Sequence, residues 1–182
     1  MTSPNWSIAT AAAAILLLAA CSNEGGTQPA NTAALAREIA ACPLLTQQEV
    51  GQAAGVTMFA GEERPPIGAG PGSGRMTTCS WKEDIDGPAP TIITLLVWSW
   101  PPGSNGAANY LASFRKAAEE FPDLPEPEPV ELGEEASWDG TSLHARAGDV
   151  SISISVSKPD VDAATARAAS ETLARLVLDR VG

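Results

Sequence analysis

Apolar and polar residues alternate most regularly in the last third of the chain. Two pairs of turn-forming residues, Asp139-Gly140 and Gly148-Asp149, interrupt this alternation and predict two successive β-hairpins. A two-residue loop at Gly148-Asp149 brings apolar side chains opposite each other in three pairs: Ala147 with Val150, Ala145 with Ile152, and Leu143 with Ile154. A shift of one residue would destroy every match, so this hairpin is well specified. The first loop adds a third strand over 134–138, with Glu135 opposite His144.

Two further strands are predicted upstream of this meander. In residues 75–83, apolar and polar residues alternate up to Trp81, which predicts a strand. Residues 91–100 are apolar on both faces, which is typical of a central strand covered on both sides. The glycine-rich stretch 61–74 lacks the lysine that a phosphate-binding loop requires, so we interpret it as a surface loop. The proline-rich stretch 122–129 predicts an extended acidic connector.

Four segments carry helix signals. A short Ala-rich helix is expected over 33–41, and the capping box of Thr46 and Glu49 begins a second helix that ends near residue 54. Ser104 is expected to cap a third helix, whose apolar stripe consists of Tyr110, Phe114, Ala117, Ala118 and Phe121. A last helix runs from about 160 to 181. These elements predict an α+β fold in which a largely antiparallel sheet, ending in a three-stranded meander, packs against about three helices.

The first 20 residues carry no charged side chain, and residues 11–20 form an apolar run that ends at Cys21. This run is too short to span a bilayer, and it is typical of the apolar core of a secretory signal. The sequence Leu18-Ala19-Ala20-Cys21 resembles the lipobox of bacterial lipoprotein precursors. The resemblance implies a signal peptide over 1–20, cleavage before Cys21, acylation of that cysteine, and a lipidated tether over 21–32. One departure is that residues 1–7 lack the usual Lys or Arg, so either the true start differs or the signal is weak at its first end. The alternative to lipidation is an ordinary signal peptide with an incidental cysteine.

A lipidated Cys21 predicts an exported lipoprotein held on a membrane of the cell envelope by acyl chains such as palmitate, with inner or outer membrane left open. Residues 33–182 then form a single α+β domain. The two remaining cysteines, Cys42 and Cys79, predict one disulfide in an oxidising compartment, the alternative being two free buried thiols. The sequence has no Cys/His spacing of a zinc site, so we predict no metal and no cofactor.

Composition adds a strong charge bias. The chain has 182 residues, with 22 acidic and 11 basic side chains and a formal net charge of −11. This excess argues against nucleic acid as a partner, because phosphate binding requires clustered Lys and Arg. Many of the carboxylates gather within residues 119–135, and we interpret that stretch as a solvated surface rather than a cation or partner site.

Two sets of residues are candidates for chemistry. Glu135, His144 and Ser153 can share one sheet face, which is the residue set of a hydrolase, but the sharp turn that exposes a nucleophilic serine is missing. We interpret them as a polar sheet face. The second set is a ligand site for a small apolar or sugar-like molecule, made of Trp98, Trp100, Trp138, His144 and Arg146, the alternative being core packing of the tryptophans.

A family resemblance is carried by four short motifs: Cys42-Pro43-Leu44-Leu45-Thr46, Cys79-Ser80-Trp81, Leu132-Gly133-Glu134-Glu135-Ala136 and Arg146-Ala147-Gly148-Asp149. They resemble a set of small bacterial lipoproteins of unknown function, distantly similar to the extracellular sensor domain of PknH-type receptor kinases. Glu134 stands where that pattern commonly has Asp. The resemblance implies a disulfide between the first helix and the Trp81 strand, and it brings no catalytic residue.

The function predicted from the sequence is therefore a lipid-anchored, non-enzymatic binding or accessory domain of the cell envelope. The first alternative is an interaction module that holds an envelope protein. The second is a hydrolase, which requires His144 within hydrogen-bond reach of both a carboxylate and an exposed hydroxyl.

Overall fold

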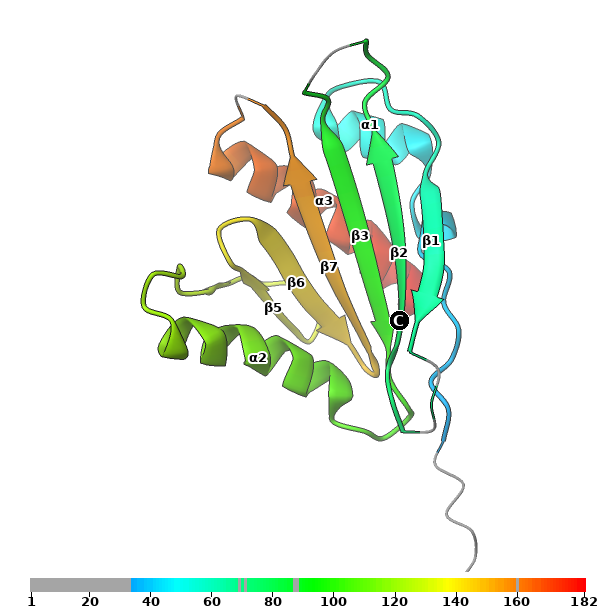
Figure 1. Cartoon of the computed structure of the whole chain (residues 1–182), viewed down its shortest axis with the longest axis vertical. Coiled ribbons are helices and arrows are strands. Elements are labelled where there is room, and N and C mark those ends of the chain that lie inside the picture. The colour runs from blue at the N-terminus through cyan, green and yellow to red at the C-terminus, as the bar shows by residue number, and fades with distance from the viewer. Residues whose placement is uncertain (1–33, 69, 71, 87–88, 160) are drawn as a thin grey trace, which may run out of the picture. The chain divides into compact units, whose positions relative to one another are not determined.

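The computed structural model describes residues 34–68, 70, 72–86, 89–159 and 161–182 (Figure 1). The signal peptide, Cys21 and the tether that the sequence predicts lie outside these residues, so they stay predictions. Among the described helices, none combines the length and the hydropathy that crossing a bilayer requires.

Seven strands form one antiparallel sheet in the order β1-β2-β3-β7-β6-β5-β4. Two meanders meet in its middle, where β3 pairs with β7. The sheet and its three helices confirm the predicted α+β fold and its C-terminal meander. The strands are β1 Glu62–Ile67, β2 Arg75–Lys82, β3 Ile92–Ser99, β4 Glu128–Pro129, β5 Glu135–Trp138, β6 Ser142–Ala147 and β7 Val150–Ser157.

The registers of the C-terminal meander confirm one prediction and correct another. The β6–β7 pairs are as predicted, but Glu135 lies opposite Arg146, and His144 lies opposite Ser137. The β5–β6 turn is longer than predicted because the Asp139 carboxylate accepts the backbone N–H groups of residues 141 and 142, at 2.8 and 2.7 Å. This two-residue shift leaves every side chain on its own face, so the alternation of the sequence cannot detect it.

One face of the sheet carries the apolar core and two helices. α1, Gln47–Ala54, begins at the predicted Thr46–Glu49 capping box and ends at Gly55, whose φ is 70°. α3, Ala163–Val181, begins at Asp162, whose carboxylate accepts the Thr165 N–H. α3 crosses behind the sheet (Figure 1) and packs against β7, β6 and α1.

The opposite face carries α2, Gly106–Glu120, which packs on β6 and β7 (Figure 1). Its N-cap is Asn105 rather than the predicted Ser104, although the Ser104 hydroxyl accepts the Gly106 N–H at 3.3 Å. The predicted stripe is correct for Tyr110 and Phe114, which are half-buried. It is wrong for Phe121, which follows the helix and is 59% exposed.

Three predictions about elements are wrong. Residues 34–40 are not helical, because they run along the sheet, where Thr77 and Ser99 donate hydrogen bonds to backbone carbonyls of the segment. Part of the predicted surface loop forms β1, which is an edge strand. Its two prolines have no backbone N–H to donate, and an edge strand tolerates this because one of its sides has no neighbouring strand. β3 is fully covered on one face only, since α2 lies over β6 and β7 and leaves Ile92 41% exposed.

The predicted disulfide is present. Cys42 and Cys79 are bonded with Cα atoms 5.0 Å apart, which excludes the alternative of two free thiols. The bond ties the 3₁₀ turn Cys42–Leu44, just before α1, to β2. It therefore closes the segment that contains α1 and β1 against the core.

Candidate binding site

The sheet face beneath α2 is polar. Four side chains of β5, β6 and β7 are buried there, namely Ser137, His144, Ser151 and Ser153. Because successive side chains of a strand point to opposite faces, these residues alternate with the core residues of the same strands. α2 therefore packs on hydroxyls and an imidazole, where α3 packs on aliphatic side chains.

A row of aromatic side chains fills the space between α2 and this face. Trp98 stacks on Trp100 with ring centroids 5.4 Å apart, and Tyr110 lies 6.1 Å from Trp98. Phe114 follows at 5.1 Å from Tyr110 and stacks on His144 at 3.6 Å. The contacts among the Trp, Tyr and Phe rings lie in the range where aromatic pairs stabilise each other. The row is a packed layer rather than an open cleft.

Trp100 anchors the N-terminal end of α2. Its Nε1–H donates to the Ser151 hydroxyl at 3.0 Å. A side chain at Gly106 would lie within 2.3 Å of the indole ring, and one at Gly74 within 2.7 Å. The ring is therefore enclosed by two glycines, which is a role in packing.

The predicted ligand site is not assembled as a set. Trp138 is buried in the core on the other face of the sheet, because it alternates with Ser137 along β5. Arg146 forms ion pairs with Glu134 and Glu135, its Nε lying 3.1 Å from Glu135. Only Trp98, Trp100 and His144 of the predicted set share the aromatic layer under α2.

His144 is held by a carboxylate that sequence reasoning missed. Its Nε2 lies 2.9 Å from Asp139 Oδ2, which fits an Nε2–H that donates to the carboxylate. Burial raises the pKa of Asp139, but hydrogen bonds from His144, Thr141 and Ser142 outweigh it and hold that pKa well below its usual value. The Asp139-Gly140 turn is the sequence feature that could have indicated this role for Asp139, because Asp often accepts hydrogen bonds from the N–H groups of its own turn.

The predicted set Glu135, His144 and Ser153 does not form a catalytic arrangement. Glu135 pairs with two arginines instead of with His144. Ser153 lies opposite His144 in the register but is buried, and the Nδ1 atom of His144 is buried with no partner among the described residues. An exposed nucleophile beside the imidazole is therefore missing from the part of the chain that is described.

A groove lies beyond Phe114, between the C-terminal half of α2 and the connector 122–127; we call it the α2 groove. Two adjoining hollows of about 180 and 420 Å³ compose it, and they share Ala118, Leu124 and Pro127. The smaller hollow is also lined by Phe114, Ala117, Pro125, Asp139 and Thr141. The larger is also lined by Arg115, Glu119, Pro122 and Glu126.

The wall of the α2 groove is stiff. Three of the six connector residues are prolines, whose φ angles are fixed by their rings. The connector is held at one end by the Leu124 N–H, which donates to the Phe121 carbonyl at 2.9 Å, and at the other by β4, which pairs with β5. Pro125 lies against the turn at Gly140, where an added Cβ would be 3.2 Å from it. The groove is therefore formed before anything enters it.

The charge of the α2 groove is negative. Arg115 lines it but lies 2.6 Å from Glu135, and this arginine lowers the pKa of the Glu135 carboxyl. Glu119 and Glu126 are exposed and form no ion pair with the cations of the described residues. The acidic connector, interpreted from the sequence as a solvated surface, thus forms one wall of a groove with an apolar hollow and an acidic hollow.

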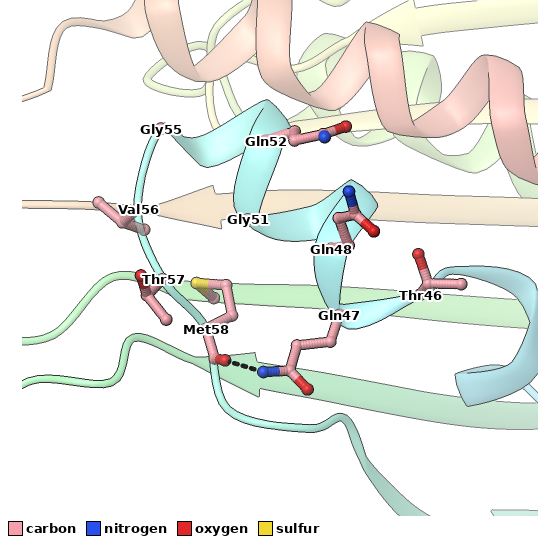
Figure 2. A pocket seen from close by; sticks show the side chains of 9 residues that line it. All are labelled: Thr46, Gln47, Gln48, Gly51, Gln52, Gly55, Val56, Thr57 and Met58. Carbon is pink, nitrogen blue, oxygen red and sulfur yellow. Dashed lines mark hydrogen bonds between the residues drawn. The ribbon is translucent and has the colours of Figure 1, made fainter.

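A wider hollow of about 730 Å³ lies beside α1 and is drawn in Figure 2. It is lined only by residues of α1, its cap and the turn that follows, within residues 46–58. Gln47 donates its side-chain N–H to the Met58 carbonyl at 2.5 Å, so one of its three glutamines is already occupied. None of its lining side chains is charged or aromatic, and the lining combines glutamine amides and threonine hydroxyls with the aliphatic side chains of Val56 and Met58.

Within the described ranges, no cluster of three or more His, Cys, Asp or Glu side chains has the arrangement of a metal site.

The chain matches no protein-family model, and it has no significant match among curated proteins or solved structures. Any conclusion about function therefore rests on the geometry of the α2 groove and on the sequence of the N-terminal segment.

Proposed function

We propose that the protein is a lipid-anchored accessory domain of the cell envelope, which binds a partner or ligand in the α2 groove and does not catalyse a reaction. The lipobox-like sequence ending at Cys21 supports the anchor and the location. The groove supports binding, because a pre-formed apolar hollow with a few polar groups at its edge is the usual form of a binding site.

The observation that carries this proposal is the stiff apolar lining of the α2 groove. Leu124 is 49% exposed at its wall and Phe121 is 59% exposed at the end of α2. Neighbouring exposed apolar residues beside a hollow are typical of interaction sites. Proline walls reduce the conformational entropy lost when an occupant binds.

The hydrolase alternative has less support. His144 Nε2 contacts the Asp139 carboxylate, and Phe114 covers the ring by stacking on it. A general base needs access to the hydroxyl that it deprotonates, and the serine opposite His144 is buried beneath α2. A role in holding α2 to the sheet accounts for these contacts without a reaction.

Groove filling tests the binding proposal. Ala118 lines both hollows, so Ala118→Leu reduces their volume, whereas Ala112→Leu places the same side chain on the exposed side of the same helix. We expect native mass spectrometry of the purified protein to detect a bound species that Ala118→Leu loses and Ala112→Leu keeps. Equal occupancy in both variants, with circular dichroism confirming their folding, would refute the α2 groove as the site.

Cell fractionation tests the anchor. We expect wild-type protein in the membrane fraction and the Cys21→Ser variant in the soluble exported fraction, because loss of the thiol prevents acylation. A variant that remains with membranes as completely as the wild type would contradict the lipid anchor.

A further inference from the structure

We propose that the occupant of the α2 groove is a short extended segment of a partner protein, with an apolar residue two positions away from a Lys or Arg. This inference rests on the proposed function and names its partner by chemistry. It follows from the shape of the two hollows, their charge and their closeness to each other.

The smaller hollow selects an apolar group. Its volume of about 180 Å³ suits one side chain, and Phe114, Ala117, Ala118 and two prolines supply most of its lining. Burying one aliphatic or aromatic side chain there removes apolar surface from water on both sides. This hollow is the anchor of the proposed interaction.

The larger hollow selects a cation. Glu119 and Glu126 line it without a basic partner among the described residues, and the charge of Arg115 is compensated by Glu135. The formal net charge of −11 also attracts cationic partners from a distance. A Lys or Arg has an aliphatic stem that can follow Leu124 and Pro127 while its charged end meets the carboxylates.

The closeness of the hollows indicates a peptide. Because they share three lining residues, one short segment can present an apolar group to the smaller hollow and a cation to the larger. Residues i and i+2 of an extended segment point to the same side and lie about 7 Å apart. A free small cation would occupy only the acidic hollow, and a free apolar ligand only the other.

Titration with synthetic peptides, followed by ¹⁵N NMR of the purified protein, tests this inference. The probe is acetyl-Ser-Leu-Ser-Lys-Ser-amide; one control replaces its lysine by glutamate and another replaces its leucine by alanine. We expect the probe to cause saturable chemical-shift changes at the amides of Ala118 and Leu124. We expect either control peptide to bind with an apparent dissociation constant at least tenfold higher. Equal binding of the glutamate peptide would overturn the proposal, as would shifts confined to another surface.

Matched charge variants separate a specific contact from general attraction. Glu119→Gln with Glu126→Gln removes two carboxylates from the groove, and Asp84→Asn with Asp86→Asn removes two exposed ones from the β2–β3 connection. We expect the first pair to raise the dissociation constant of the probe about three- to tenfold and the second less than twofold. An equal effect of both pairs would show that net charge alone attracts the peptide and would overturn the proposal.

The two proposals fail separately. If the probe does not bind, but native mass spectrometry detects a bound species that only Ala118→Leu loses, the peptide inference is wrong and the groove remains a binding site. If the probe does not bind and Ala118→Leu changes nothing, both are wrong.

Discussion

α3 and α2 lie on opposite faces of the same sheet and are held there differently. Eight residues of α3 are buried, and its core contacts are made by aliphatic side chains such as Leu173 and Val177. Only Ala107 and Leu111 of α2 are buried. α2 is held instead by half-buried rings and, at its N-terminal end, by Trp100, whose ring lies against Gly106 and is fixed by its hydrogen bond to Ser151.

The difference separates stability from function. The α3 face contains the disulfide and the continuous apolar core, so it supplies most of the free energy of folding. The α2 face leaves its C-terminal end without such packing, and the α2 groove lies there. The groove therefore lies apart from the apolar core that stabilises the fold.

The largest expected effect concerns the disulfide on the α3 face. Replacing Cys42 and Cys79 together by alanine should lower the free energy of unfolding by about 4 kcal/mol, because the unfolded chain regains the entropy of a 37-residue loop. Urea unfolding followed by tryptophan fluorescence measures this. A loss below about 1 kcal/mol would mean that the α1 segment is held without the bond.

A matched pair of variants compares the two helices directly. Leu173→Ala should lower the free energy of unfolding by about 3 kcal/mol, because it empties a fully buried site. Phe114→Ala should lower it by about 2 kcal/mol, because the ring, although larger, is only half-buried. Equilibrium unfolding gives both values. If Phe114→Ala were the more damaging variant, α2 would be part of the main core and the comparison would be wrong.

A smaller effect should appear at Glu49, which joins the two helices of the α3 face. Its carboxylate accepts the Thr46 N–H at 2.8 Å and pairs with Arg180 at 2.5 Å. The Arg180 hydrogen bond, followed by the Thr46 backbone bond, lowers the pKa of Glu49 from its usual 4.5 to about 2.

Because this pKa is lowered by folding, the stabilisation is present above about pH 4.5 and is lost as the pH falls towards about 2. Glu49→Gln should cost about 1–2 kcal/mol at neutral pH and almost nothing at pH 2. Thermal unfolding as a function of pH tests this. Asp84→Asn is the control, and it should shift the curve at neither pH, since its side chain is exposed. A constant difference between wild type and Glu49→Gln at all pH values would contradict the lowered pKa.

Local signals identified the elements whose stability is local. The Thr46–Glu49 capping box predicted the start of α1, and the apolar pairs of β6 and β7 predicted their register. The failures come from long-range contacts. Residues 34–40 have helix-forming alanines, but side chains of β2 and β3 bind their carbonyls and hold them along the sheet. β1 contains two prolines and is a strand only because β2 offers it an edge.

The candidate site shows the same division. Tryptophan content suggested an aromatic site, but the β3–β7 pairing decides which face each tryptophan occupies, and it separates Trp138 from Trp98. The α2 groove was missed, because its walls come from α2, the connector and the β5–β6 turn. No local pattern reports that these segments meet.

The sequence by itself determined the antiparallel α+β character of the domain, the limits of α1, and the β6–β7 hairpin, because periodicity, capping and turn chemistry act over a few neighbouring residues. The tertiary structure alone decided the partner of His144, the place of β1, and the conversion of an acidic connector into the wall of a groove. These depend on contacts between distant segments, and their free energy exists only once the sheet has brought those segments together.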